Sequence, residues 1–164
     1  MTRKLLLPTL TVLLLSSAGM RRAAQGQTTS TGLSGSWLGI TTLPPGVDNG
    51  AGGNTVAFML VFNPNGTVTT VIAQNGNGSD GVGAGNWVST GNGQFALTTN
   101  QFVYDGSGNY AGNNKSRASL NVSGNQMNGN VELIVSDATG AVQGSITGIT
   151  FTAAPIAVET IGSM

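Results

Sequence analysis

The chain has 164 residues, 26 of them glycine, and it contains neither cysteine nor histidine. A chain of this length fits one domain. The missing cysteine excludes disulfides and thiol catalysis, and the missing histidine excludes Ser-His nucleophiles and histidine metal ligands. Charged residues make up only 7% of the chain and sum to a formal net charge of zero, so no basic surface for nucleic acid is expected.

Residues 1–26 are predicted to be a secretory signal peptide. Basic residues in "MTRK" precede an apolar run at 5–15, and small residues follow it, which is the order typical of such leaders. The run is too short to span a bilayer as a helix, which takes about 20 residues. Cleavage is expected after Gly26, with Ala18 as the alternative, and the protein is expected to be secreted or periplasmic.

Removal of this leader changes the charge of the protein. Four of the six basic residues lie within it, so two basic residues remain against six acidic ones, a net charge of −4. Nucleic acid and membrane surfaces are therefore not expected among the partners, because both attract clustered lysine and arginine. No stable membrane anchor is expected, since the missing cysteine excludes a lipoprotein anchor.

Residues 27–33 are small and polar and are predicted to form a flexible tether. From 34 to 153, short apolar groups alternate with turn signals at intervals of roughly 8–15 residues, as in all-β sandwiches and barrels. Longer loops are expected only at 42–53 and 75–82. The expected strands are 34–41, 54–62, 67–74, 83–89, 94–104, 109–122, 127–137 and 141–153.

Short connections place consecutive strands side by side, and closure of the sheet removes its exposed edges. The predicted fold is therefore all-β, an eight-stranded up-and-down antiparallel barrel over 34–153. Residues 154–164 are expected to be a C-terminal tail.

Three turns share an Asx-x-x-Gly frame: "NPNG" at 63–66, "DGSG" at 105–108 and "DATG" at 137–140. In "NPNG", proline suits the second turn position and glycine the position with positive φ, which predicts a type I turn closed by a glycine bulge. For "DATG" two registers stay open, since a plain two-residue loop would pair Val135 with Val142.

Alternation of apolar residues predicts which side chains face the interior. If residues 124–125 form a two-residue loop, Val122 lies opposite Met127, and Arg117 lies opposite Glu132 on the outer face. In the fifth strand, Leu97 and Phe102 have opposite parity, so a bulge is expected between them. The apolar inward sets are Val56, Phe58, Leu60 and Phe62; Ala118, Leu120 and Val122; and Met127, Val131, Leu133 and Val135.

No catalytic or metal site and no cofactor is predicted. Asp105 and Asp137 begin turns, where a carboxylate bonds its own backbone. "DGSGN" lacks the late glutamate of a calcium loop. Asp48 and Asp80 lie in the two long loops and are interpreted as solvated, the alternative being a carboxylate pair of the glycosidase type.

The two cations outside the leader, Lys115 and Arg117, stand two residues apart on one strand. Since they share a face with polar neighbours, we interpret them as solvated, the alternative being a grip on an anionic ligand.

Large apolar and aromatic residues are the candidates for a ligand-binding interior, because an eight-stranded barrel either is filled by side chains or holds one small ligand. Plain core packing is the alternative for all of them. Tyr104 and Tyr110 flank the "DGSG" turn as an expected cross-strand pair. The candidate ligand-binding residues are Trp37, Phe58, Leu60, Phe62, Phe102, Tyr104 and Tyr110.

"GSW" at 35–37, at the start of the first strand, resembles the Gly-x-Trp signature of lipocalins, in which the tryptophan closes one end of an eight-stranded barrel. The resemblance covers roughly residues 33–153. A second signature, Gly85 to Trp87, and the missing arginine and terminal helix depart from that family and are more similar to a divergent calycin-type or allene-oxide-cyclase-like barrel. The resemblance implies capture of a small apolar ligand, with Trp37 buried at a barrel end.

Three functions follow as hypotheses. The preferred one is a secreted barrel that binds a small hydrophobic molecule in its interior. The second is a cyclase or isomerase that positions an apolar substrate and uses tyrosine, glutamate or aspartate as its acid or base. The third is a structural or surface protein with a filled barrel.

Overall fold

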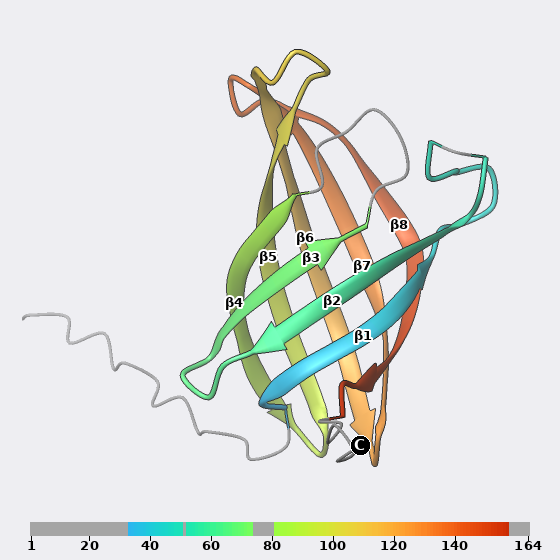
Figure 1. Cartoon of the computed structure of the whole chain (residues 1–164), viewed down its shortest axis with the longest axis vertical. Coiled ribbons are helices and arrows are strands. Elements are labelled where there is room, and N and C mark those ends of the chain that lie inside the picture. The colour runs from blue at the N-terminus through green and yellow to red at the C-terminus, as the bar shows by residue number, and fades with distance from the viewer. Residues whose placement is uncertain (1–32, 51, 74–80, 158–164) are drawn as a thin grey trace, which may run out of the picture.

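One antiparallel sheet closes into a barrel in the computed structural model, which describes residues 33–50, 52–73 and 81–157 (Figure 1). The strands follow one another around the barrel in chain order, and β1 pairs with β8 to close it. Within the described residues the strands are β1 (Gly35–Thr42), β2 (Thr55–Phe62), β3 (Thr67–Ile72), β4 (Val82–Gly91), β5 (Gln94–Tyr104), β6 (Tyr110–Ser123), β7 (Gln126–Asp137) and β8 (Val142–Pro155).

The predicted fold class is confirmed, and each expected strand is found with both ends within two residues of the prediction. The proposed signal peptide, most of the 75–82 loop and the end of the tail lie outside the described residues. Leu33, assigned to the tether, is instead fully buried in the hydrophobic core.

The barrel has two different ends, visible in Figure 1. The β1–β2 loop and the β5–β6 and β7–β8 turns lie at one end, which we call the mouth. The β2–β3 turn and the ends of β7 and β8 that carry Met127 and Ala153 lie at the other, which we call the floor. Each strand therefore runs from one end of the barrel to the other, with half of its residues near the mouth and half near the floor.

The three Asx-x-x-Gly turns adopt one geometry. In the β2–β3 turn the Gly66 N–H donates to the Asn63 carbonyl (3.1 Å), and φ of Gly66 is 85°. Gly108 and Gly140 have φ of 81° and 86° in the same position. This is the predicted type I turn with a glycine bulge. It settles the open register at "DATG", because the Asp137 backbone N–H donates to the Ala141 carbonyl.

Below that turn the pairing shifts again, so that Val135 lies opposite Gly144 and not opposite Val142.

Turn carboxylates bind backbone N–H groups at the mouth. The Asp105 side chain accepts hydrogen bonds from the Asn109 and Ser107 N–H groups at 2.8 and 2.9 Å. Asp137 accepts from the Thr139 hydroxyl and the Ala141 N–H at 2.7 and 3.0 Å. Hydrogen bonds from Asn109 lower the pKa of Asp105, and those from Thr139 and Ala141 lower the pKa of Asp137, because such bonds favour the ionised form.

The interior register of β6 and β7 is as predicted. Val122 lies opposite Met127, and Arg117 lies opposite Glu132 on the outer face. The Arg117 Nε–H donates to Glu132 Oε2 at 3.1 Å. Because both side chains reach solvent, the pair adds only about 0–1 kcal/mol to stability.

The predicted bulge between Leu97 and Phe102 is wrong. The strand β5 alternates without interruption, so Thr99 and Gln101 are buried on the same side as Leu97, and Phe102 points outward. The register shift lies further along, where Val103 pairs with Gly112 and Tyr104 with Tyr110. The prediction failed because it assigned apolar residues to the interior, whereas this part of the interior is polar.

The glycines of the two Gly-x-Trp signatures are required for different physical reasons. Gly35 has a φ of 118°, which L side chains rarely adopt, and open space where a Cβ would stand. Gly85 lies so close to β5 that a Cβ would meet the Thr98 carbonyl oxygen and lie 2.7 Å from the Thr99 Cα. Gly35 is therefore required by backbone conformation, and Gly85 by close approach of backbone.

We predict that Gly85→Ala destabilises the protein by about 3 kcal/mol or more, because backbone cannot yield as a flexible side chain can. Gly144→Ala is the matched control, since no atom lies within 4 Å of its added Cβ, and its effect should stay within about 0.5 kcal/mol. Urea unfolding measures both. Equal stability of the two variants would contradict the close approach.

Acid should destabilise the protein through its turn carboxylates. A lowered folded-state pKa gives stability that is present above the unfolded-state value and is lost as the pH falls through the folded-state value. The loss is expected to begin below about pH 4, near the ordinary pKa of aspartate, and to grow as the pH falls. An Asp105→Asn, Asp137→Asn double variant should lose less stability over this range in urea unfolding, and a profile parallel to that of the parent protein would refute the assignment.

Candidate functional site

A cavity of about 330 Å³ occupies the mouth half of the barrel interior. Its volume lies at the lower end of the range for small-molecule sites, about 300–1,000 Å³. Residues of the β1–β2 loop border it, and the described strands other than β4 contribute side chains to it. At this height β4 carries glycine at its inward positions, Gly83 and Gly85.

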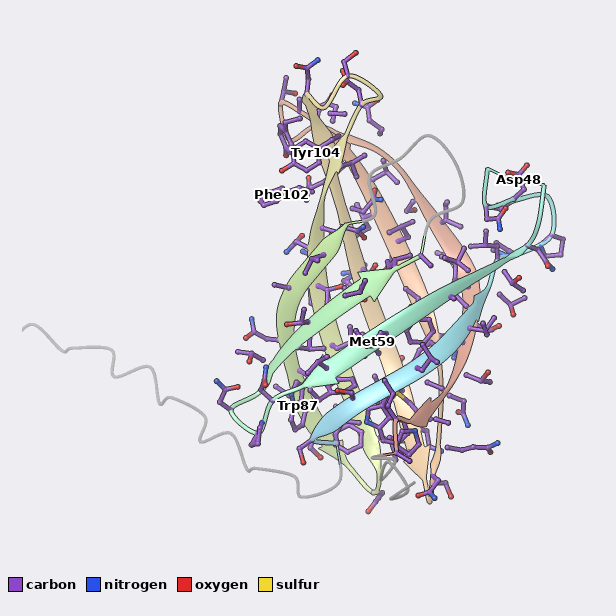
Figure 2. The ribbon with its side chains drawn as sticks, in the orientation of Figure 1. Asp48, Met59, Trp87, Phe102 and Tyr104 are labelled. Atoms are coloured by element: carbon purple, nitrogen blue, oxygen red, sulfur yellow. The ribbon has the colours of Figure 1, made fainter. Side chains whose placement is uncertain are left out.

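The floor is filled by a packed aromatic cluster. The Trp87 ring makes edge-to-face contacts with Phe62 and Phe95, with centroids 6.0 and 5.8 Å apart. Its Nε1–H donates to the Asn63 carbonyl at 3.1 Å, which satisfies the one polar group of a buried indole. Figure 2 shows Trp87 at this end and Asp48 at the other. The remaining buried residues of the cluster include Leu33, Trp37, Leu120 and Met127.

Two phenylalanines separate this floor from the cavity. Phe58 and Phe151 meet edge to face with centroids 5.5 Å apart, and both line the cavity. Each ring covers the glycine opposite it on the neighbouring strand, Phe58 over Gly39 and Phe151 over Gly129. A side chain at either glycine would displace the ring, so these pairs fix the base of the cavity.

The structure places the predicted ligand-binding residues in three groups. Phe58 and Leu60 line the cavity. Trp37, which is 5% exposed, and Phe62 belong to the floor. The expectation that Trp37 is buried at a barrel end is therefore confirmed.

The other three predicted residues lie on the outer face and do not line the cavity. Phe102, Tyr104 and Tyr110 are 61%, 41% and 44% exposed. The Tyr110 ring contacts Phe102 and Tyr104 at centroid distances of 5.8 and 6.3 Å. Tyr104 and Tyr110 form the predicted cross-strand pair, so these rings support the β5–β6 hairpin from outside, at about 0.5–1.5 kcal/mol a contact.

One wall of the cavity is polar and was not predicted. Thr70, Thr99 and Gln101 are buried there, and Asn114 and Ser116 stand opposite Gln101 and Thr99 on β6. Continuing the alternation of Phe95 and Leu97 would have placed Thr99 and Gln101 on the inner face, but the bulge expected after Leu97 led to the opposite assignment.

The wall's polar atoms face the hollow. The Gln101 Nε2 donates to the Gly81 carbonyl at 3.1 Å. The hydroxyls of Thr70 and Thr99 have no hydrogen-bond partner among the described residues. Every fully enclosed side-chain nitrogen or oxygen of the described residues does have a partner, so these two hydroxyls must be accessible from the cavity, where a ligand or water can bond to them.

The rest of the lining is mainly apolar. It comes from β2, β7 and β8 and from Ile72, the inward residue next to Thr70 on β3, so a molecule in the cavity meets both hydrocarbon and hydrogen-bonding groups. This combination orients a bound ligand as well as burying it. The apolar wall consists of Val56, Ile72, Val131, Leu133, Ile146 and Ile149.

The β1–β2 loop shapes the mouth. The Asn49 side chain holds it, donating to the Thr55 carbonyl at 2.8 Å and accepting from the Gly53 N–H at 3.1 Å. The Asp48 carboxylate accepts from the Gly50 N–H at 2.7 Å, and its residue borders the cavity. Asp80, its predicted companion, lies outside the described residues, so the proposed carboxylate pair stays untested.

The described part of the chain contains no group of three or more acidic residues that could hold a metal ion. It also contains no helix long and apolar enough to cross a bilayer. No family model matches the chain, and no similar curated protein or solved structure was found. The function has to be inferred from the cavity itself.

Both tryptophans lie in the floor, so their fluorescence reports on the packing of that end. We expect blue-shifted emission and weak quenching by acrylamide in the folded protein, because Trp37 and Trp87 are 5% and 3% exposed. The urea-unfolded chain is the control and should be readily quenched. Strong quenching of the folded protein would show that the floor is open.

Proposed function

We propose that the protein is a secreted or periplasmic lipocalin-like barrel that binds one small, mainly apolar molecule in its cavity. The closed eight-stranded barrel is compatible with such a fold, and burial of Trp37 at the floor supports the resemblance. The observation that carries the proposal is the hollow of about 330 Å³ above a packed floor.

The contrast between the two halves of the interior supports ligand capture over a filled structural barrel. The floor half contains large side chains in edge-to-face contact, whereas the mouth half has small and polar residues at Thr70, Thr99 and Ser116. Interiors pack at the density of organic crystals where nothing else occupies them. A half that departs from this density has room for an occupant.

A cyclase or isomerase would need an acid or base among the buried aromatic residues. The ionisable residue that borders the cavity in the described part of the chain is Asp48, which lies exposed in the mouth loop. Both described tyrosines are on the outer face. Binding without chemistry is therefore the function that the geometry supports best.

Filling the cavity should abolish binding without unfolding the barrel. Ala118 lines the cavity, and its neighbour Ser119 is exposed on the outer face of the same strand. We expect Ala118→Trp to weaken binding of the uncharged dye N-phenyl-1-naphthylamine by about tenfold or more, and Ser119→Trp to leave it unchanged.

Dye fluorescence titration measures both affinities, and circular dichroism shows whether each variant keeps its strands. Full binding by a folded Ala118→Trp variant, or no binding by the parent protein, would contradict the proposal.

A further inference from the structure

We infer that the cavity discriminates by head-group charge: it accepts amphiphiles with an uncharged or cationic hydrogen-bonding head and disfavours carboxylates. This inference rests on the proposed function, because it concerns the ligand of the same cavity. Three observations carry it: the neutral polar wall, the acidic mouth and the position of the two described cations.

The polar wall can bond a head group but cannot neutralise an anion. Thr99, Gln101, Asn114 and Ser116 carry hydroxyl and amide groups, and no lysine or arginine borders the cavity among the described residues. An ionised carboxylate moved from water to this wall would lose hydration without gaining a positive partner, which is costly. A hydroxyl or an amine exchanges its water for these acceptors at much smaller cost.

The polar wall also fixes how the ligand lies. Phe58 and Phe151 form the apolar base, while Gln101 and Asn114 stand two residues closer to the mouth than Thr99 and Ser116. A hydrocarbon tail therefore points toward the base, and the head lies among the amides at the mouth side of the cavity. Asp48, at the mouth end (Figure 2), borders the same cavity.

Three acidic residues lie at the mouth end in the part of the chain that the structure describes. Asp48 borders the cavity, and Asp105 and Asp137 begin the β5–β6 and β7–β8 turns at the same end (Figure 1). Carboxylates are ionised at neutral pH, so the three residues give the entrance a negative potential, which attracts cations and repels anions.

The basic residues of the described chain do not offset this potential inside the barrel. Arg117 is paired with Glu132 on the outer face of β6 and β7. Lys115 lies at the same parity of β6, two residues away, and its register partners are Asn100 and Ile134. Both cations are therefore separated from the cavity by the sheet.

Three ligands of equal chain length test the inference: octylammonium, 1-octanol and octanoate, each competing with N-phenyl-1-naphthylamine at neutral pH and low salt. Octylammonium and octanoate are both charged, so their comparison isolates the sign of the charge from hydration. We expect octylammonium and 1-octanol each to bind at least about tenfold more tightly than octanoate. The ratio of octylammonium to octanoate affinity should fall as salt is added.

Asp48→Asn should lower that ratio by about threefold or more, because it removes the carboxylate that borders the cavity. Glu132→Gln is the matched control: it removes the same charge from the outer face, and the ratio should not change. Octanoate binding as tightly as octylammonium, or an unchanged ratio in Asp48→Asn, overturns the inference and leaves the proposed function standing. If neither the dye nor any of the three ligands binds, the proposed function fails as well.

Discussion

A closed barrel of eight strands has an interior whose width is set by strand number and stagger, and this chain fills only one half of it. At the floor, Trp87, Phe62 and Phe95 interlock in edge-to-face contacts. Toward the mouth, many inward positions hold small, polar or β-branched residues, and a cavity remains. The division between a packed end and a hollow end determines where a ligand can bind.

Glycine contributes to this division at four inward positions. On β4, Gly83 and Gly85 let the neighbouring strands approach so closely that no side chain fits at either position. On β1 and β7, Gly39 and Gly129 each sit beneath a phenylalanine ring of the next strand. The same residue type thus tightens one wall and seats the two rings that form the base of the cavity.

Much of the fold could be predicted because turn chemistry and alternation agreed. The Asx-x-x-Gly turns set hairpin positions, and the pairing of Val122 with Met127 followed from a two-residue loop. The site was harder to predict. Thr99 and Gln101 are polar yet inward, and Phe102 is aromatic yet exposed, so hydrophobicity gave the wrong face for the upper part of β5. A hollow interior relaxes the rule that inward residues are apolar, and one sequence does not reveal where the hollow begins.

The most direct test of the half-filled interior is a crystal structure determined under xenon pressure. Xenon enters apolar cavities that side chains leave empty. We predict xenon between the apolar wall and the base of the cavity, in contact with Phe58, Ile149 and Phe151. A barrel in which side chains fill the mouth half, with no xenon inside, would contradict the account.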